Sequence, residues 1–310
     1  MPRMLPLCAA LLSAVMPARS ADPVRLTRAG DRIEVSLGGR PFTAFFTGAD
    51  TPKPYLHPLR SASGKVVTRS FPMEKLPGET TTDQHHRGVW LGYKSIDGFN
   101  FWENEFSYHD PRAGKVVTAS LAVDSAAGAI HGVFTWLAPD GRPILQESRV
   151  MTFAGDASTR TIDVTIDLKA LTAATFGDAK DGAFCIRLAE PLIEKNGGTI
   201  LNSEGGRQMA QTWGKPASWI DYSGTLDGER LGVALFEHPS SFHHPSRWHV
   251  RDYGLLAINP FGAAGFDKTL PSAAFTLPEG QAIHLRYRIL IHPAIDAARL
   301  ADLYRQFAAR

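Results

Sequence analysis

Four strand-like segments that follow one another with only short turns between them constrain the fold most. They cover residues 116–123, 129–137, 143–153 and 160–168, and Gly-, Pro- or Asp-containing turns join them at 124–128, 139–142 and 155–158. Parallel neighbours would need a crossover of roughly a dozen residues or more between strands. Because these connections are much shorter, the sequence predicts an antiparallel meander.

Other segments extend the same pattern on both sides. Residues 31–46 predict a hairpin that turns at Gly38-Gly39. Further strand-like runs cover 183–190, 230–237, 254–259 and 282–291, and apolar residues from Ala297 to Phe307 recur at helical spacing. Because the sequence contains no repeat of fixed period and no low-complexity linker, we expect residues 21–310 to form one mainly β domain, a large antiparallel β-sandwich with a C-terminal helix.

The first 20 residues differ from the rest. Arg3 precedes the apolar run 4–16, and the small residues Ala18 and Ser20 follow it. These are the parts of a cleavable secretory signal, and the run is too short to span a bilayer. A lipoprotein anchored at Cys8 fits less well, because small residues do not precede that cysteine. We therefore expect cleavage after residue 20 and a periplasmic or secreted protein.

Cleavage changes the charge and the cysteine content. It removes Arg3 and Arg19, and so leaves 31 Lys+Arg against 31 Asp+Glu. A neutral chain argues against nucleic acid or an anionic membrane surface as a partner, and no later run is long and apolar enough to be a spanning helix. Only Cys185 remains, so no internal disulfide is possible, and its apolar surroundings predict a buried side chain.

Three polar, aromatic segments interrupt the strand pattern: 53–60, 80–90 with the aromatic stretch 99–109, and 237–253 running into 259–262. Most of the histidines lie in or beside them, several directly before a proline. Histidine–proline pairs belong at strand ends and in loops, where sandwich proteins commonly carry binding groups. Turn histidines without a function are the alternative for each single position.

Histidine exchanges protons near neutral pH, so these segments suggest acid–base chemistry. The predicted catalytic residues are His85, His86, His244 and His249, with Glu204, Asp221 and Asp252 as the nearest carboxylates. Arginine forks can orient hydroxyl or carboxylate groups, and flat aromatic faces stack on sugar rings, although core packing is the alternative for each aromatic. The predicted substrate-binding residues are Tyr55, His57, Arg60, Arg87, Trp90, Trp213, His238, Trp248 and Arg251.

No cofactor motif accompanies these residues. A G-x-G-x-x-G turn, a Walker loop and a G-x-S-x-G elbow are all missing from the sequence. No ligand spacing typical of a metal site occurs within one segment, and the adjacent His85 and His86 could both bind a metal only from a loop. No cofactor and no metal ligands are therefore predicted, while a His-ligated divalent metal remains an alternative.

Several runs resemble one known family. They are 54–60, 83–90, 213–219 with 221–224, and 238–254 continuing to Asn259-Pro260-Phe261. In this order they resemble the PmoA-like family of exported bacterial proteins of unknown function, over roughly residues 30–295. The name methane oxygenase PmoA is often attached to that family, but a membrane-embedded oxygenase subunit is incompatible with a chain that has no spanning segment.

The resemblance implies a β-sandwich that works among polysaccharide-degrading functions. The chain is also similar to galactose mutarotases, which have a large antiparallel supersandwich and use a histidine acid and a carboxylate base. Neither of those two residues matches an individual position here, so the similarity assigns no role.

Together these features predict an exported carbohydrate-active protein. We expect an enzyme that hydrolyses, eliminates or epimerises a sugar or oligosaccharide by histidine–carboxylate chemistry. A non-catalytic carbohydrate-binding module and a metalloprotein are the alternatives. The prediction requires segments 83–90 and 238–252 to share one pocket.

Overall fold

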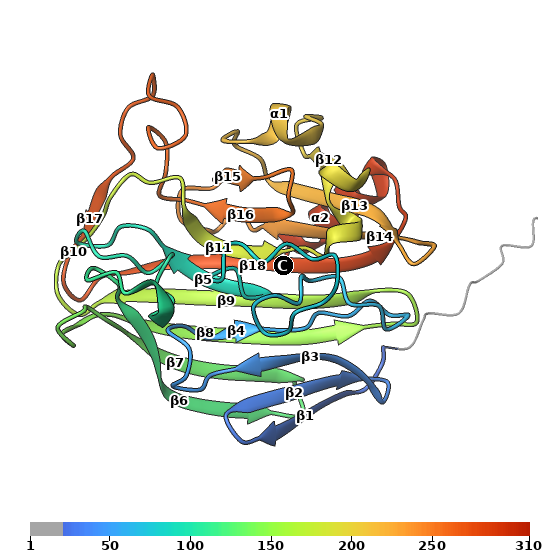
Figure 1. Ribbon diagram of the computed structural model, residues 1–310, viewed down its shortest axis with the longest axis horizontal. Coiled ribbons are helices and arrows are strands. Elements are labelled where there is room, and N and C mark those ends of the chain that lie inside the picture. Colours follow the sequence, from blue (N-terminus) through green and yellow to red (C-terminus); the bar gives the residue numbers. More distant parts are fainter. Residues whose placement is uncertain (1–20) are drawn as a thin grey trace, which may run out of the picture.

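The computed structural model describes residues 21–310, in which two large antiparallel sheets lie face to face (Figure 1). Strands make up 46% of the structure. The predicted signal, residues 1–20, lies outside the described residues. The predicted fold class, a mainly β antiparallel sandwich with a C-terminal helix, is confirmed.

The first sheet has eight strands in the order β1-β2-β3-β4-β5-β11-β16-β15. Their bounds are β1 Val24–Ala29, β2 Arg32–Leu37, β3 Arg40–Phe46, β4 Tyr55–Leu56, β5 Val89–Tyr93, β11 Gly182–Arg187, β15 Arg247–Val250 and β16 Leu255–Asn259. The predicted hairpin at 31–46 is β2 and β3. Strand β11 ends before the predicted residue 190, because Glu190–Leu192, with Pro191 in its first turn, forms a 3-10 helix.

The second sheet also has eight strands, in the order β12-β13-β14-β18-β9-β8-β7-β6. Their bounds are β6 Lys115–Asp124, β7 Ala129–Leu137, β8 Pro143–Gly155, β9 Arg160–Ala170, β12 Thr199–Asn202, β13 Trp219–Leu226, β14 Glu229–Glu237 and β18 Ala282–Pro293. The predicted meander is confirmed as β6 to β9, with consecutive strands paired antiparallel. A small sheet pairs β10 Ala174–Phe176 with β17 Phe275–Leu277.

The core lies between the two large sheets. The register of the first sheet aligns one row of apolar residues that face the second sheet: Ile33, Phe45, Leu56, Val89, Ile186, Leu256 and Val250. Side chains alternate between the faces of a strand, so the next row along must face outward. That outward row forms the floor of the site described below.

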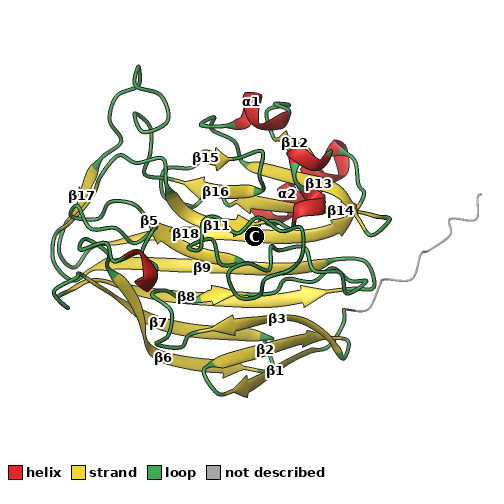
Figure 2. Ribbon diagram, viewed as in Figure 1, coloured by secondary structure: helices red, strands yellow, loops and turns green. Residues whose placement is uncertain are grey.

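Helices cover only parts of this framework (Figure 2). Helix α1 spans Gln208–Thr212, and α2 spans Ala297–Ala308, where Asp296 caps the first turn. Leu300 and Phe307 of α2 pack on Trp219 and Phe236, on the outer face of the second sheet. No helix within residues 21–310 is long and apolar enough to cross a membrane.

Candidate functional site

The outer face of the first sheet carries a hollow between large side chains. Register aligns Arg32, Phe46, Tyr55, Trp90, Cys185, Ala257 and His249 in one row across the strands. Cys185 and Ala257, which lie between Trp90 and His249 in this row, have small side chains and therefore leave a hollow there. Cys185 is a fully buried free thiol, as predicted, and burial raises its pKa well above the usual value.

A cavity of about 280 Å³ lies over this hollow, and we call it the histidine cavity. It is lined by Asp83, His85, His86, Trp102, Glu103, Lys180, Asp181, His249, Arg251, Tyr253 and Leu255. The loop before β5 and the β15–β16 hairpin therefore meet in one pocket. The requirement of the sequence prediction is thus met by the 249–251 end of segment 238–252, whereas its first half, with His238 and His244, does not line this cavity.

A buried arginine and a glycine fix the conformation of the loop before β5. The buried guanidinium of Arg69 donates to the main-chain carbonyls of Thr82 and Asp83, at 2.9 and 2.8 Å. Gly88 has φ +55°, and a Cβ there would lie 2.2 Å from the carbonyl oxygen of Leu56. The loop consequently turns sharply, and its two adjacent histidines both reach the cavity, with ring centroids 4.2 Å apart.

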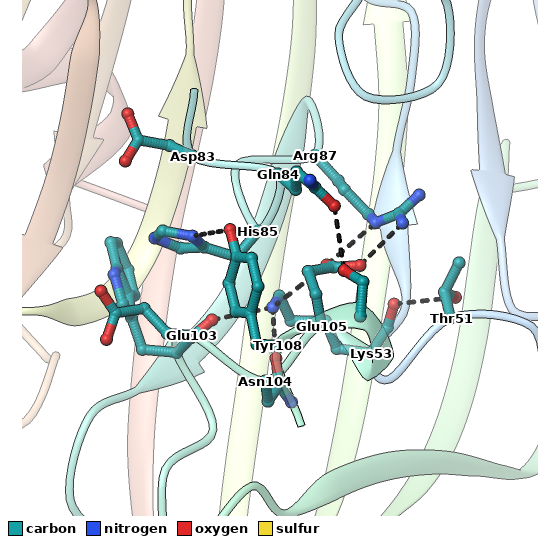
Figure 3. Close-up of polar contacts among 12 residues, drawn as sticks. Thr51, Lys53, Asp83, Gln84, His85, Arg87, Glu103, Asn104, Glu105 and Tyr108 are labelled. Atoms are coloured by element: carbon teal, nitrogen blue, oxygen red, sulfur yellow. Dashed lines mark hydrogen bonds and ion pairs between the residues drawn. The ribbon is translucent and has the colours of Figure 1, made fainter. Parts of the chain in front are cut away.

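A second loop, between β5 and β6, covers the cavity with Trp102. The buried Lys53 ammonium donates to the Trp102 carbonyl, at 2.9 Å, and to the side chain of Asn104 (Figure 3). Glu105 of the same loop accepts two hydrogen bonds from Arg87, at 3.0 and 2.7 Å. Burial lowers the pKa of Lys53 to about 8. Lys53 and Arg87 thus anchor the covering loop.

All three cavity histidines favour the neutral form. Burial lowers the pKa of His85 to about 2 and that of His249 to about 4, and it holds the pKa of His86 well below its usual value. Arg187 donates to Nδ1 of His86, at 3.3 Å, so the neutral ring carries its proton on Nε2. His249 differs, because the Asp181 carboxylate lies 3.5 Å from its Nδ1 and favours the protonated ring.

Cations gather at one end of the cavity, around the ring of Tyr253. The guanidinium of Arg187 lies 4.4 Å from the ring centroid, that of Arg251 lies 5.4 Å away, and the Lys195 ammonium 5.8 Å away. Burial raises the pKa of the Tyr253 hydroxyl. This end of the cavity therefore offers positive charge beside a flat aromatic face.

Asp83, His85 and His86 together could hold a metal ion, because one possible ligand atom from each lies within 4.8 Å of the others. Arg187 competes for the same place. Its Nη1 is 3.8 Å from an Asp83 oxygen and 3.3 Å from Nδ1 of His86. A metal would have to displace this guanidinium or bind on its far side.

Several predicted binding residues lie near the cavity without lining it. Trp90 is fully buried under His86, with stacked rings 5.1 Å apart. Arg87 lies 5.5 Å from the ring of Tyr55, beyond Trp90 in the same row. Trp213 is half-buried and packs against Phe266, which in turn contacts His249.

His57 and Arg60 belong to a different cavity of about 390 Å³, over β2, β3 and the segment that follows β4. Burial lowers the pKa of His57 to about 4, and its Nδ1 lies 3.4 Å from the Thr68 hydroxyl. Trp248, next to His249 on β15, points the opposite way into the core and donates to the carbonyl of Ala217. Strand alternation separates these two neighbours.

The structure places two predicted histidines on the far layer. His238 contacts Phe307 of α2, and His244 lies 3.2 Å from the buried Glu237 carboxylate. Both follow β14, a strand of the second sheet, which carries them away from the histidine cavity.

None of the three predicted carboxylates lines the histidine cavity. Asp221 is buried against His292 on the second sheet, and Glu204 is exposed in the turn after β12. Asp252 lies at the β15–β16 turn and pairs with Lys195 at 3.6 Å. The carboxylates that do line it, Asp83, Glu103 and Asp181, were not among the predicted ones. Asp83 and Glu103 lie within the segments that the sequence singled out, whereas Asp181 comes near His249 only because β11 pairs with β16 and β16 with β15.

Other residues in or beside the cavity had weak sequence signals or none. Trp102 and Tyr253 lie in the aromatic segments that the sequence singled out. Arg187 ends the otherwise apolar run of β11, which is an unusual place for a charge and could have marked it. Asp181 and Lys180 sit in an ordinary polar loop, and nothing local distinguishes them.

Comparison with known proteins gives one family. The model of a family of unknown function (DUF6807) matches residues 32–305. No curated protein matches the chain in sequence.

Solved structures share parts of the architecture at low identity. The GH36 α-galactosidase AgaB of Geobacillus stearothermophilus aligns with 87% of this chain, at 9% identity and a TM-score of 0.42. A galactose mutarotase related enzyme of Lactobacillus acidophilus aligns with 88% of this chain and 98% of its own, at 9% identity and a TM-score of 0.39. The chain spans about two fifths (41%) of the length of AgaB, and the activities in these names belong to those proteins.

Proposed function

Since the chain belongs to the DUF6807 family of unknown function, we propose from its own residues that it is a carbohydrate-active enzyme that transfers protons in the histidine cavity. One observation carries the proposal. A neutral imidazole, His249, lies beside the Asp181 carboxylate in a cavity that also offers polar and flat aromatic groups.

His249 is the proposed base. With Asp181 on its Nδ1 side, the proton of the neutral ring is best placed on Nδ1, and Nε2 is left as the acceptor. Once His249 takes a proton, Asp181 stabilises the resulting imidazolium. In the structure Nδ1 makes no hydrogen bond, and a bound ligand that excludes water would shorten its contact with Asp181.

The rest of the cavity suits one sugar unit. Its volume of about 280 Å³ lies just below the range of roughly 300–1,000 Å³ for drug-sized ligands. Trp102 and Tyr253 offer flat faces for the apolar side of a sugar ring. His86 accepts from Arg187 at Nδ1 and can donate from Nε2 to a hydroxyl group. Nδ1 of His85 lies 3.1 Å from the Tyr108 hydroxyl, so its Nε2 is the nitrogen left for a hydroxyl group of the ligand.

The test is proton exchange with solvent as well as product formation. Wild-type protein is incubated with a panel of mono- and oligosaccharides in D₂O, and mass spectrometry follows both new products and deuterium uptake at carbon. General acid–base catalysis contributes about 10²–10⁴-fold, so His249→Ala should slow either signal by at least ~100-fold. His131→Ala, an exposed histidine on β7, is the matched control.

Three results would contradict the proposal. His249→Ala could retain full activity, His131→Ala could lose as much, or sugars could bind without any turnover or deuterium uptake. The last result would instead indicate the non-catalytic binding module.

A divalent metal is the second candidate, favoured by the Asp83, His85 and His86 group. Elemental analysis of protein purified without chelators and then supplemented with metal would test it. A content near one ion per chain that falls in His86→Ala would support it, whereas a content near zero would remove it.

Export is proposed on the sequence of residues 1–20 alone. Amino-terminal sequencing of the mature protein from cell fractions would test it, with Ala21 expected as the first residue. An intact Met1 on cytoplasmic protein would contradict it.

A further inference from the structure

We infer that the ligand of the histidine cavity is an acidic sugar, such as a uronate, whose carboxylate binds Arg251. The inference rests on the proposed function, because it names the substrate class for that same cavity. It depends on which charges of the cavity wall are already paired.

Most charged groups at the cavity have a partner within the protein. Lys180 donates to the neighbouring Asp181 at 2.7 Å, and Glu103 pairs with Lys94. Asp83 lies 3.8 Å from Arg187. These pairs compensate one another and leave no net charge for a ligand to balance.

Arg251 is the exception. Within residues 21–310 its guanidinium pairs with no carboxylate and donates no hydrogen bond, and its Nε is buried without a partner. Arg251 as a whole is half-buried, but a buried donor without an acceptor still costs stability. A ligand group that accepts two parallel hydrogen bonds would remove this cost.

The hairpin holds Arg251 ready for such a ligand. Its backbone N–H donates to Leu255 at 2.9 Å, and Gly254 donates back to its carbonyl at 3.0 Å, so the turn is closed. The guanidinium lies over Tyr253, and Arg187 and Lys195 also approach that ring. Arg187 and Lys195 lie 3.8 and 3.6 Å from the carboxylates of Asp83 and Asp252, so Arg251 is the one of these three cations without an acidic partner among the described residues.

A carboxylate fits this arrangement better than a phosphate does. Its planar pair of oxygens matches one guanidinium fork, and its single charge matches the single unpaired cation. A phosphate ester carries roughly one more negative charge than a carboxylate, and it would place that charge near Asp83 and Asp181, which line the same cavity. The unpaired group therefore selects a monoanion.

Isothermal titration with matched sugars tests the inference. Wild-type protein is titrated with D-glucuronate against D-glucose, D-galacturonate against D-galactose, and D-glucose 6-phosphate as the phosphate probe. A bidentate charge-assisted pair predicts a preference for the acid of roughly 10–100-fold over its neutral partner. Arg251→Gln should abolish that preference and leave the affinity for the neutral sugar within a few-fold, whereas Arg251→Lys should retain part of it.

Arg230→Gln, at an exposed arginine on β14 of the second sheet, is the matched control and should keep the preference. Equal wild-type affinity for acid and neutral sugar would overturn the inference while leaving sugar binding intact. Tighter binding of the 6-phosphate than of either acid would also overturn it. Failure of every sugar to bind would overturn the proposed function as well, and thermal melting shows whether each variant is folded.

Discussion

Asp221→Ala should cost stability and leave the histidine cavity unaffected. Both ring nitrogens of His292 donate: Nε2 to an Asp221 oxygen at 3.0 Å, and Nδ1 to the Pro293 carbonyl at 2.7 Å. Only the imidazolium can donate twice, and the pKa of His292 is accordingly raised, against the opposing effect of burial. Asp221 therefore belongs to a buried ion pair on the second sheet.

The magnitude follows from what the substitution leaves behind. His292 is 1% exposed, and a Cβ on Gly232 would lie 2.3 Å from its ring, so the ring has no room to move to water. Breaking a buried ion pair costs about 3–5 kcal/mol when the remaining charge stays. Histidine can release its proton instead, which limits the loss to that of a charged hydrogen bond, roughly 1.5–3 kcal/mol. We expect about 2–3 kcal/mol near pH 6.

The pH dependence has a definite sign. The folded protein binds the His292 proton more tightly than the unfolded chain does, so the pair stabilises fully below the unfolded pKa of about 6.5. This contribution is lost as pH rises through the raised folded pKa. The stability difference between wild type and Asp221→Ala should therefore shrink from pH 6 to pH 9.

Urea unfolding at pH 6 and pH 9 measures the loss of stability and its pH dependence. Titration with the sugar panel measures whether the histidine cavity still binds sugars. Asp227→Asn, which removes an exposed carboxylate, is the control and should change stability little. An unchanged stability, or an equal loss at both pH values, would refute the reasoning. Loss of turnover or sugar binding in a fully folded Asp221→Ala protein would restore Asp221 to the site.

Further substitutions test the framework of the site and the core. Gly88→Ala should cost at least ~1–3 kcal/mol in urea unfolding and weaken sugar binding, because the new Cβ would lie 2.2 Å from a carbonyl oxygen. Gly30 also has a positive φ but lies in open space, so Gly30→Ala is the control and should cost less. Equal losses in the two variants would contradict the steric explanation. Glu147→Ala should cost about 3–5 kcal/mol, because it leaves the buried guanidinium of Arg149 unpaired; a thermal shift no larger than that of a surface variant would contradict this. Because the pKa of Lys53 is lowered to about 8, the unfolded chain binds this proton more tightly, and stability should rise between about pH 8 and 10.5; Lys53→Met should lack that rise in urea titrations.

Local pattern was sufficient for much of the fold. Alternating side chains and short turns predicted the meander β6 to β9 and the β2–β3 hairpin, and helical spacing predicted α2. These elements carry their own signal, because a half-buried strand or helix repeats its environment every two or 3.6 residues. Strands β4 and β15 are short and lie in irregular aromatic sequence, so pairing with neighbours, rather than local pattern, defines them.

The candidate site, like the fold, could be predicted only in part from the sequence. Sequence alone identified the polar loops and four of the cavity residues, His85, His86, His249 and Arg251, because histidine and arginine are conspicuous in loops between strands. It assigned their carboxylates by proximity along the chain. Only the tertiary structure decided that Asp181 stands beside His249, and that Asp221 stands beside His292 on the other sheet.

The physical reason is that neighbours across a sheet are set by register and strand order. Strands β5, β11, β16 and β15 are adjacent in space although their residues run from 89 to 259, and the small side chains of Cys185 and Ala257 form a hollow only when these strands align. Residue type determined which groups could do chemistry. Packing of the two sheets determined which of them share a cavity, and which charge, Arg251, has no partner there.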